Sequence, residues 1–366
     1  MKPMKTGIIG CGNISQAYFN GGKMFRILDV KACADLNLEV ARKKAGENGV
    51  TAMSVDELLS DPEIELAINL TIPAVHAAVS LQALAAGKHV HSEKPLAIDL
   101  AEAQKVIQVA QEKRLRVGCA PDTFLGAGLQ TSRKLMDDGW IGRPLSGTIF
   151  MMGRGPEGWH PNPAFFYQKG GGPMFDMGPY YITALVHLLG PVKSVTGMAV
   201  KGFAQRRATS KERFGELLPV DVPTHNAGVI EFQSGVIITA TISFDVHAHG
   251  HAPIEIYGAT GSLKVPDPNG FGGDVQVWTA AAREWKSVGF THGYKENSRG
   301  IGAADLAYGV RTGRAHRASG ELALHVLEVM CAFETSMQTQ ARVAVATTCV
   351  QPAPLPLGLV DGLLDE

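Results

Sequence analysis

The feature that most constrains the fold is a regular alternation of strand-like and helix-like segments over the first third of the chain. Short apolar runs, typical of buried parallel strands, lie at residues 5–10, 29–34, 66–70, 88–91 and 115–120. The segments between them have helical spacing, at residues 14–20, 38–45, 74–86 and 100–113. Strands that are apolar throughout must be covered on both faces, so the pattern predicts an α/β fold with a doubly wound parallel sheet.

The rhythm changes after residue 122, where β-type runs follow one another with turn residues between them. These runs cover residues 195–200, 227–232, 236–244, 254–257, 262–265 and 274–278, and helices are expected at 179–189, 303–311 and 319–339. This arrangement predicts a C-terminal α+β domain with an open, largely antiparallel sheet. We therefore expect two domains, at residues 1–122 and 123–366.

Composition narrows the possible partners and the compartment. The 34 basic and 35 acidic residues are interspersed and give a net charge of −1, which disfavours a nucleic-acid or membrane partner. The five cysteines are far apart and never form a CxxC pair, so neither a disulfide framework nor a zinc site is expected. Because no apolar leader precedes the first strand and no long apolar run follows, we expect a cytoplasmic protein.

A glycine-rich segment, Gly10-Cys11-Gly12-Asn13-Ile14-Ser15, ends the first strand and opens the first helix. A tight turn in any α/β protein would need glycine, so the segment alone is weak evidence. Its position after a strand and before a helix, however, is typical of dinucleotide binding, where the backbone approaches a pyrophosphate at the helix N-terminus. We expect Gly10, Gly12, Asn13 and Ile14 to contact the cofactor.

Asp35 ends the second strand and indicates which dinucleotide binds. A carboxylate at this place accepts hydrogen bonds from the ribose hydroxyls and repels a 2′-phosphate. Leu36 and Asn37 follow it, with no Arg or Lys to attract that phosphate. The sequence therefore favours NAD over NADP.

Three further clusters together resemble one family. They are residues 69–73 (NLTIP) with His76, Glu93-Lys94-Pro95, and residues 170–178 (GGGPMFDMG). With the glycine-rich segment, and in this order over essentially the whole chain, they resemble the glucose-fructose oxidoreductase, inositol dehydrogenase and rhizopine catabolism (Gfo/Idh/MocA) family.

The resemblance implies a Rossmann domain followed by an α/β domain whose open sheet face commonly forms the interface of a homodimer or homotetramer. It implies that Lys94 lies between nicotinamide and substrate, that Asp176 serves the substrate, and that Thr71, Pro73, His76 and Glu93 also belong to the cofactor site. The substrate would be a carbohydrate-like small molecule.

The chain departs from the family pattern D-x-G-x-H-x-x-D at two positions. Tyr180 stands where the histidine is expected, and Thr183 where the last aspartate is expected. Asp176, Tyr180 and Thr183 would share one helix face if the helix begins near Asp176. Alcohol oxidation needs a base, and two candidates remain: Tyr180 with its pKa lowered by the nearby Lys94, or Lys94 itself with its pKa lowered by burial.

Other polar and aromatic residues are candidates for substrate contact. Trp159 and His160 lie in a long segment, residues 153–173, that is rich in glycine, proline and aromatics. Trp159 could stack on a sugar ring, while His160 could bind hydroxyls or act as an alternative base; packing within the loop explains both equally well. Asp122 follows the last strand of the first domain and is either a substrate contact or part of a turn between domains. His247, His249 and His251 alternate along the chain, a pattern that could indicate a metal site. We do not expect such a site, because no carboxylate cluster accompanies them.

We therefore expect an NAD-dependent dehydrogenase acting on a hydroxyl carbon of a sugar, polyol, sugar acid or glycoside. One alternative is a redox-neutral enzyme that retains NAD and uses transient oxidation for elimination or glycoside cleavage, as some members of the family do. Another is an NAD-bound regulatory protein, against which the presence of Lys94 and Asp176 argues.

Overall fold

Two β-sheets organise the molecule, and the computed structural model describes residues 1–365. The first sheet is wholly parallel, in the order β3-β2-β1-β4-β5-β6. Its strands are β1 (Met4–Ile9), β2 (Leu28–Ala34), β3 (Thr51–Met53), β4 (Leu66–Asn69), β5 (His89–Ser92) and β6 (Val117–Cys119). The expected doubly wound parallel sheet is confirmed.

The helices that follow these strands are α1 (Ser15–Met24), α2 (Leu38–Asn48), α3 (Val55–Ser60), α4 (His76–Ala85) and α5 (Leu100–Lys113). Their ends follow local rules: Ser54 and Glu57 form a reciprocal capping box on α3, and Gly49 ends α2 with a φ of 72°. The strand β3 is too short and too exposed to have been visible in the apolar pattern.

The second sheet is mixed, in the order β16-β15-β14-β13-β7-β12-β11-β8-β17. Its longer strands are β7 (Pro144–Met152), β8 (Val192–Val200), β11 (His225–Phe232), β12 (Ile237–Ser243), β13 (Ile254–Gly258), β14 (Gly261–Val265) and β15 (Val275–Thr279), and the shorter ones are β16 (Trp285–Val288) and β17 (Val343–Ala344). Within this second sheet, as far as the structure describes it, β7 and β12 pair in parallel and the other pairs are antiparallel, as expected.

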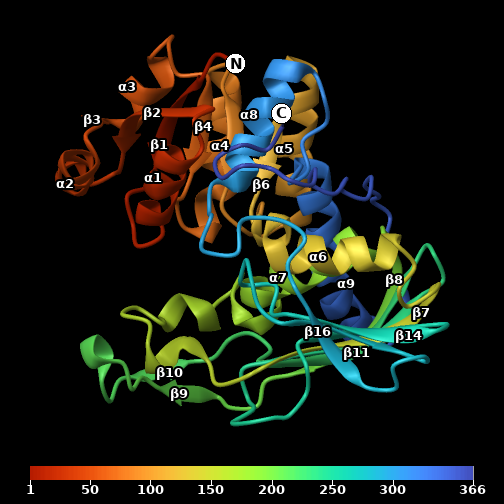
Figure 1. Cartoon of the computed structure of the whole chain (residues 1–366). Helices are drawn as coiled ribbons and strands as arrows, with labels where there is room; N and C mark the ends of the chain where they lie inside the picture. Colours follow the sequence, from red (N-terminus) through yellow and green to blue (C-terminus); the bar gives the residue numbers. More distant parts are fainter. Residues whose placement is uncertain (366) are drawn as a thin grey trace.

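Helices α6 (Ala127–Asp137), α7 (Gly172–Leu189) and α9 (Gly320–Thr339) lie between the two sheets, and a separate two-stranded hairpin, β9 (Gln205–Arg207) with β10 (Leu217–Pro219), lies at the lower left (Figure 1). Helix α8 (Ile301–Thr312) packs against β2, β5 and β6, so part of the C-terminal segment covers the first sheet. The division into residues 1–122 and 123–366 stays a prediction.

The start of α7 corrects the sequence analysis. The helix was expected from residue 179, but it begins at Gly172, with Pro173 in its first turn and Pro179 inside it. Proline suits the first turn because the N–H that it lacks has no intrahelical partner there. The longer helix carries Asp176 and Tyr180 on successive turns of one face.

No helix within residues 1–365 combines the length and the apolar character that crossing a membrane requires.

Candidate active site

The glycine-rich turn between β1 and α1 has a shape that only glycine allows at one position. Gly10 has a φ of +98°, and a Cβ there would lie 2.7 Å from the carbonyl group of Leu70. A Cβ at Gly12, in contrast, would point into open space, more than 4 Å from the non-neighbouring residues that the structure describes. The hydroxyl of Ser15 donates to the Gly12 carbonyl at 2.7 Å and closes the turn.

This turn fits a dinucleotide. No side chain within residues 1–365 caps the N-terminus of α1, and Gly12 and Asn13 are exposed there. The N–H groups of Ser15 and Ala17 bond to carbonyl groups within the turn, so a pyrophosphate would approach the exposed backbone of Gly12 and Asn13. Asp35 accepts hydrogen bonds from the N–H groups of Cys11 and Asn37, both at 2.9 Å, and its half-buried carboxylate lies beside the turn. NAD bound here would supply a hydride acceptor.

The loop after β4 contributes Thr71, Pro73 and His76, but in different ways. Thr71 and Pro73 are half-buried, and Thr71 donates its hydroxyl hydrogen to Asn69 at 2.6 Å. His76 is buried, with ring nitrogens 2.7 Å from the Pro95 carbonyl and 2.9 Å from the Thr71 carbonyl. Burial lowers the pKa of His76. The ring of His76 thus joins two loops, and its predicted contact with the cofactor stays a prediction.

Glu93 holds the loop after β5 in place. Its carboxylate accepts hydrogen bonds from the Tyr18 hydroxyl at 2.9 Å and from the Lys94 N–H at 3.0 Å. Tyr18 belongs to α1, so the loop that carries Lys94 is connected directly to the helix that begins at the glycine-rich turn. The sequence analysis missed Tyr18, because nothing in its neighbourhood distinguishes it from a core aromatic.

Lys94 and Asp176 form an ion pair at the centre of the site. The Lys94 Nζ lies 2.7 Å from Asp176 Oδ1 and 2.6 Å from the Asp176 carbonyl oxygen, and the two side chains are 16% and 20% exposed. The same Nζ lies 5.1 Å from the ring centre of Tyr180. The structure therefore brings together the three residues that the sequence analysis selected for chemistry.

The pKa values of this cluster differ from the two expectations. Burial lowers the pKa of Lys94, but Asp176 and Tyr180 outweigh it and leave the pKa above its ordinary value. Burial raises the pKa of Tyr180, and the opposing effect of Lys94 is smaller. Neither candidate base thus has the lowered pKa that was expected, because Asp176 compensates the charge of Lys94 and Tyr180 is buried.

Arg299 is a second cation at Tyr180 that the sequence analysis did not identify. The positive charge of its guanidinium opposes the effect of burial on the pKa of Tyr180, and Tyr180 in turn raises the pKa of Arg299. Its backbone is fixed from both sides: a Cβ on Gly21 would overlap the Arg299 carbonyl oxygen, and the next N–H, that of Gly300, donates to Asp122 at 3.0 Å. Nothing near Arg299 in the sequence points to this contact.

Asp122 supports a helix end. Its Oδ2 accepts hydrogen bonds from the N–H groups of Gly300 and Gly302, both at 3.0 Å, at the N-terminus of α8, and the residue is 1% exposed. The carboxylate thus positions the segment that carries Arg299, and the predicted substrate contact of Asp122 stays a prediction.

A pocket of about 360 Å³ opens beside the ion pair. Its lining comes from residues 72–74, from Lys94, Pro95 and Ile98, from residues 162–171, and from Phe175 and Asp176 at the start of α7. Within the long loop the lining side chains are Asn162, Phe165, Phe166, Gln168 and Lys169. Apolar walls with a few polar groups are typical of a small-molecule site.

Trp159 and His160 lie outside this lining. Trp159 is 67% exposed, while His160 packs edge-on against Phe165 and Phe166 and accepts a hydrogen bond from the Asn162 N–H at 3.0 Å. The long loop does reach the pocket, as expected, but through its later residues. The high aromatic content of the loop had not shown which of its aromatics would face inward.

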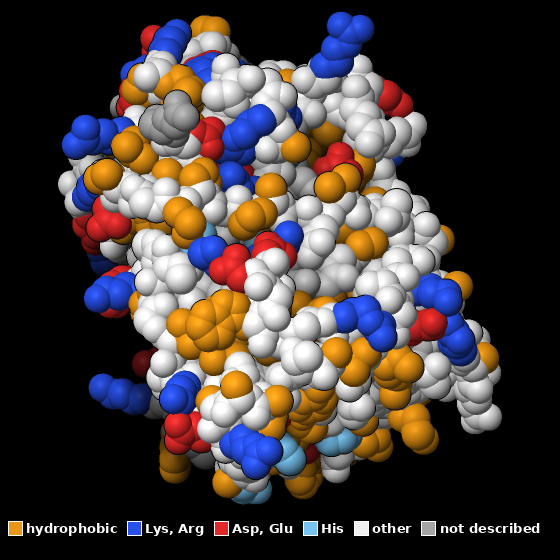
Figure 2. Space-filling model, turned by 45° about the vertical axis from the view of Figure 1, so that its right-hand side comes forward, with side chains coloured by type: hydrophobic (Ala, Val, Ile, Leu, Met, Phe, Trp, Pro, Cys, Tyr) orange, Lys and Arg blue, Asp and Glu red, His pale blue; other side chains and the backbone are white. Residues whose placement is uncertain are grey.

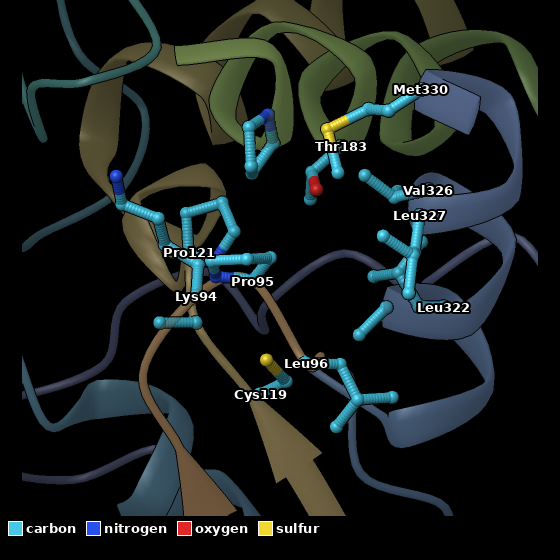
Figure 3. A pocket seen from close by; sticks show the side chains of 13 residues that line it. Lys94, Pro95, Leu96, Cys119, Pro121, Thr183, Leu322, Val326, Leu327 and Met330 are labelled. Atoms are coloured by element: carbon cyan, nitrogen blue, oxygen red, sulfur yellow. The ribbon is translucent and has the colours of Figure 1, made fainter. Parts of the chain in front are cut away.

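On the other side of Lys94 lies a small apolar cavity of about 10 Å³ (Figure 3). Pro95, Thr183 and the α9 residues Val326, Leu327 and Met330 line it, and the Lys94 amino group points away from it. Thr183 is buried there, so it packs the Lys94 loop against α7 and α9.

Metal ligands are not grouped in residues 1–365: the structure holds no cluster of three or more histidine, cysteine or acidic side chains suited to a metal ion. His247 lies 2.7 Å from Arg154 and His251 stacks on Phe150.

Two family profiles match the chain. One, described as an oxidoreductase family with an NAD-binding Rossmann fold, matches residues 4–120, and the other, a GFO/IDH/MocA C-terminal domain, matches residues 129–264. The chain belongs to the GFO/IDH/MocA oxidoreductase family. It is therefore a member of a family of NAD-binding oxidoreductases, and NAD is its cofactor.

Curated relatives carry sugar-related names. The 1,5-anhydro-D-fructose reductase of Ensifer adhaerens is 27% identical over 71% of this chain and 74% of the relative, and the levoglucosan dehydrogenase of Pseudarthrobacter phenanthrenivorans is 25% identical over 72% and 73%. An uncharacterized oxidoreductase of Schizosaccharomyces pombe is 28% identical over 54% of this chain and 55% of the relative, so the chain spans about half the length of that protein.

Among solved structures, a levoglucosan dehydrogenase in complex with NADH and levoglucosan aligns with a TM-score of 0.81 and 22% identity. The alignment covers 94% of this chain and 100% of the other. At this identity the likeness establishes the fold alone.

Proposed function

We propose that the protein is an NAD-dependent dehydrogenase that acts on a hydroxyl carbon of a sugar, polyol, sugar acid or glycoside. The observation that carries the proposal is the Lys94–Asp176 ion pair, which lines a pocket with aromatic and amide side chains and is connected through Glu93 to the helix of the cofactor turn. The names of the relatives support a carbohydrate substrate.

In this proposal Lys94 stays protonated and donates a hydrogen bond to the reacting hydroxyl oxygen, where negative charge develops. Asp176 orients the ammonium group at 2.7 Å and balances its charge. NAD held at the turn of Gly10 and Gly12 would supply the acceptor for the hydride of the carbon.

Tyr180 is the proposed proton acceptor. Its ring centre lies 5.1 Å from the Lys94 ammonium group, and the charge of Arg299 also lowers its pKa. Two cations favour the phenolate, which offsets part of the effect of burial on the pKa. Tyr180 would then take over the proton transfer that the family histidine performs.

The test is to follow NADH absorbance while the purified protein is mixed with NAD and a panel of sugars, polyols, sugar acids and glycosides. Saturable NADH formation with one chemical class establishes the dehydrogenase and its substrate class. If NAD binds and the whole panel stays silent, the proposal fails. Product analysis without added NAD would then test the redox-neutral alternative, and a lack of any product would leave the regulatory one.

We further propose a homo-oligomer, dimer or tetramer, formed through the open face of the second sheet. Met198, Val200, Val229 and Ile237 are exposed there by 40% or more, and hydrophobic side chains gather over the lower half of the molecule, which holds this sheet (Figure 2). Sedimentation velocity of the native protein and of Met198→Asp tests this, and a native monomer would contradict it. The cytoplasmic location stays a prediction.

A further inference from the structure

The segment of residues 153–173, here called the pocket loop, supplies much of the pocket wall but has little regular structure of its own. Before α7 begins at Gly172, the described residues of the loop contain two short 3₁₀ turns, Pro156–Gly158 and Ala164–Tyr167, and an isolated β-bridge between Arg154 and Asp245. Asn162, Phe165 and Phe166 of this loop line the pocket. A loop of this length keeps one shape only if other parts of the molecule hold it.

Arg206, on β9, contacts the beginning of the loop through Glu157. Its guanidinium lies 3.1 Å from Glu157 Oε1, donates to the Phe244 carbonyl at 2.7 Å and pairs with Asp245. The side chains of Arg206 and Glu157 are each only 4% exposed.

Glu157 and Asp245 extend this contact. Tyr167, at the other end of the pocket loop, donates its hydroxyl hydrogen to Glu157, and Thr224 donates to Asp245 at 2.6 Å. One arginine therefore connects both ends of the pocket loop to the strands behind it.

The surrounding segment, residues 201–222, continues the support. A small apolar cluster separate from the main core joins Tyr167 to the β9–β10 region through Ala208, Leu218, Val220 and Phe244. The Asp221 N–H donates to the Tyr167 carbonyl at 2.8 Å. At the tip of this segment Arg213 donates to the Asn162 side chain at 3.0 Å, and Asn162 lines the pocket. Figure 1 shows the two segments beside each other at the lower left.

We propose that Arg206 is a positioning residue that sets the sugar affinity of the pocket by fixing the pocket loop. A buried ion pair gains little net stability over an apolar packing of the same volume, because removing both charges from water is costly. The planar guanidinium instead fixes the relative orientation of its partners, because it binds Glu157, Asp245 and a backbone carbonyl in one geometry. The inference rests on the proposed function, since it concerns the same pocket.

The first experiment compares Arg206→Met and Arg206→Lys with Arg207→Met as the matched control. Arg207 is the neighbouring residue, exposed, and bound to the Gly215 carbonyl away from the pocket. For Arg206→Met we expect the KM for the sugar to rise about 10- to 100-fold, since small misplacements of a binding wall have effects of that order. The kcat should fall much less and the NAD affinity should stay unchanged. Arg206→Lys, which keeps the charge without the fork, should be intermediate, and Arg207→Met should match the native enzyme.

A second variant keeps the test decisive if Arg206→Met does not fold. Arg213→Met leaves the buried network intact and removes the contact with Asn162 together with an exposed ion pair to Glu216. Because an exposed ion pair contributes little to stability, the melting temperature should change little while the KM for the sugar rises about threefold. Limited proteolysis within residues 153–173 should be faster in Arg206→Lys than in Arg207→Met.

The outcomes separate this inference from the proposed function. If the native enzyme turns over a sugar and the folded Arg206 and Arg213 variants keep its KM, the positioning role is wrong and the proposed function stands. If the native enzyme forms no NADH with any substrate, the proposed function fails. The proteolysis experiment then tests by itself whether Arg206 fixes the loop. Cleavage at equal rates in Arg206→Lys and Arg207→Met would overturn that role.

Discussion

The glycine-rich turn at residues 10–15 and the pocket loop both contribute to the candidate site. The contacts that fix the two segments differ in how far apart the contacting residues lie in the sequence. The turn is fixed by its own Ser15 hydroxyl on the Gly12 carbonyl, and by the Gly10 N–H on the Ala34 carbonyl of the adjacent strand. The pocket loop depends on Arg206, which is 49 positions from its partner Glu157. The wall that faces the cofactor, residues 10–15 with Asp35, is thus held partly by its own residues and partly by the adjacent strand, 24 positions away. The wall that faces the substrate, the pocket loop, depends on residues that lie farther away in the sequence.

Because of this difference, substitutions in the two segments should affect different binding constants. Changes in the turn should alter the affinity for NAD and leave the KM for the sugar alone, while changes behind the pocket loop should do the reverse. Lys94 and Tyr180 lie where the two walls meet, so their replacement should lower kcat. Four predictions test this separation.

The largest effect is expected for Lys94→Ala. It removes the ammonium group that donates to the reacting oxygen and leaves Asp176 without its partner at 2.7 Å. Steady-state NADH formation should show kcat reduced by about 10³-fold or more, while NAD binding measured by calorimetry changes far less. Lys105→Ala, an exposed lysine on α5, is the control and should behave as native. A Lys94→Ala enzyme with native kcat would remove the ion pair from the mechanism.

The next effect is expected for Tyr180→Phe, with kcat about 10²-fold lower at neutral pH. Burial holds the pKa of Tyr180 above its ordinary value, so the phenolate fraction increases with pH throughout the neutral and mildly alkaline range. Lys94 stays protonated over this range, because its pKa is raised as well. Sugar oxidation by the native enzyme should therefore accelerate as pH rises.

The pH profile of kcat is the deciding measurement for Tyr180. In Tyr180→Phe, kcat should be low and should no longer increase with pH. The buried Tyr181, next along α7, provides Tyr181→Phe as the control, and this variant should keep the native profile. A Tyr180→Phe enzyme that keeps the alkaline acceleration would assign the proton transfer to another group.

Gly12→Val should affect the cofactor wall alone. The new side chain would occupy the open space where the pyrophosphate must approach the backbone, so the Kd for NAD should rise about 10- to 100-fold. At saturating NAD the KM for the sugar should match the native value. Gly46→Val, at another exposed glycine with open space in α2, should leave NAD binding unchanged. A large rise in the sugar KM of Gly12→Val would break the separation of the two walls.

The same difference in range explains which features the sequence could reveal. The alternating strands and helices of the first sheet, the glycine-rich turn and the capping box at Ser54 each show a pattern within a short stretch of sequence, and all were predictable. The prediction for the start of α7 was wrong because Pro179 resembles a helix boundary, whereas Pro173 fills the first-turn position.

Contacts across the fold left no such signal. Arg299 reaches Tyr180 only because Gly21 and Asp122 fix its backbone, and these three residues are far apart in the sequence. Trp159 and His160 were chosen for their chemistry, but the folding of the loop against β9 and β10 presents Phe165 and Phe166 to the pocket instead. Residue type indicates what a side chain can do, and only the packing shows where it points.

The smallest effect, and the sharpest test of the cofactor wall, is expected for Asp35→Asn. The amide oxygen still accepts the Cys11 N–H, which Asp35 binds at 2.9 Å, so the turn keeps its support while the negative charge is lost. The preference for NAD over NADP, measured as the ratio of kcat/KM values, should fall about tenfold because a 2′-phosphate is no longer repelled. Asp29→Asn, at the other end of β2 where Asp29 pairs with Lys5 at the surface, should keep the native ratio. If Asp35→Asn keeps the full preference, the discrimination lies outside the local turn, and the cofactor wall also depends on distant residues.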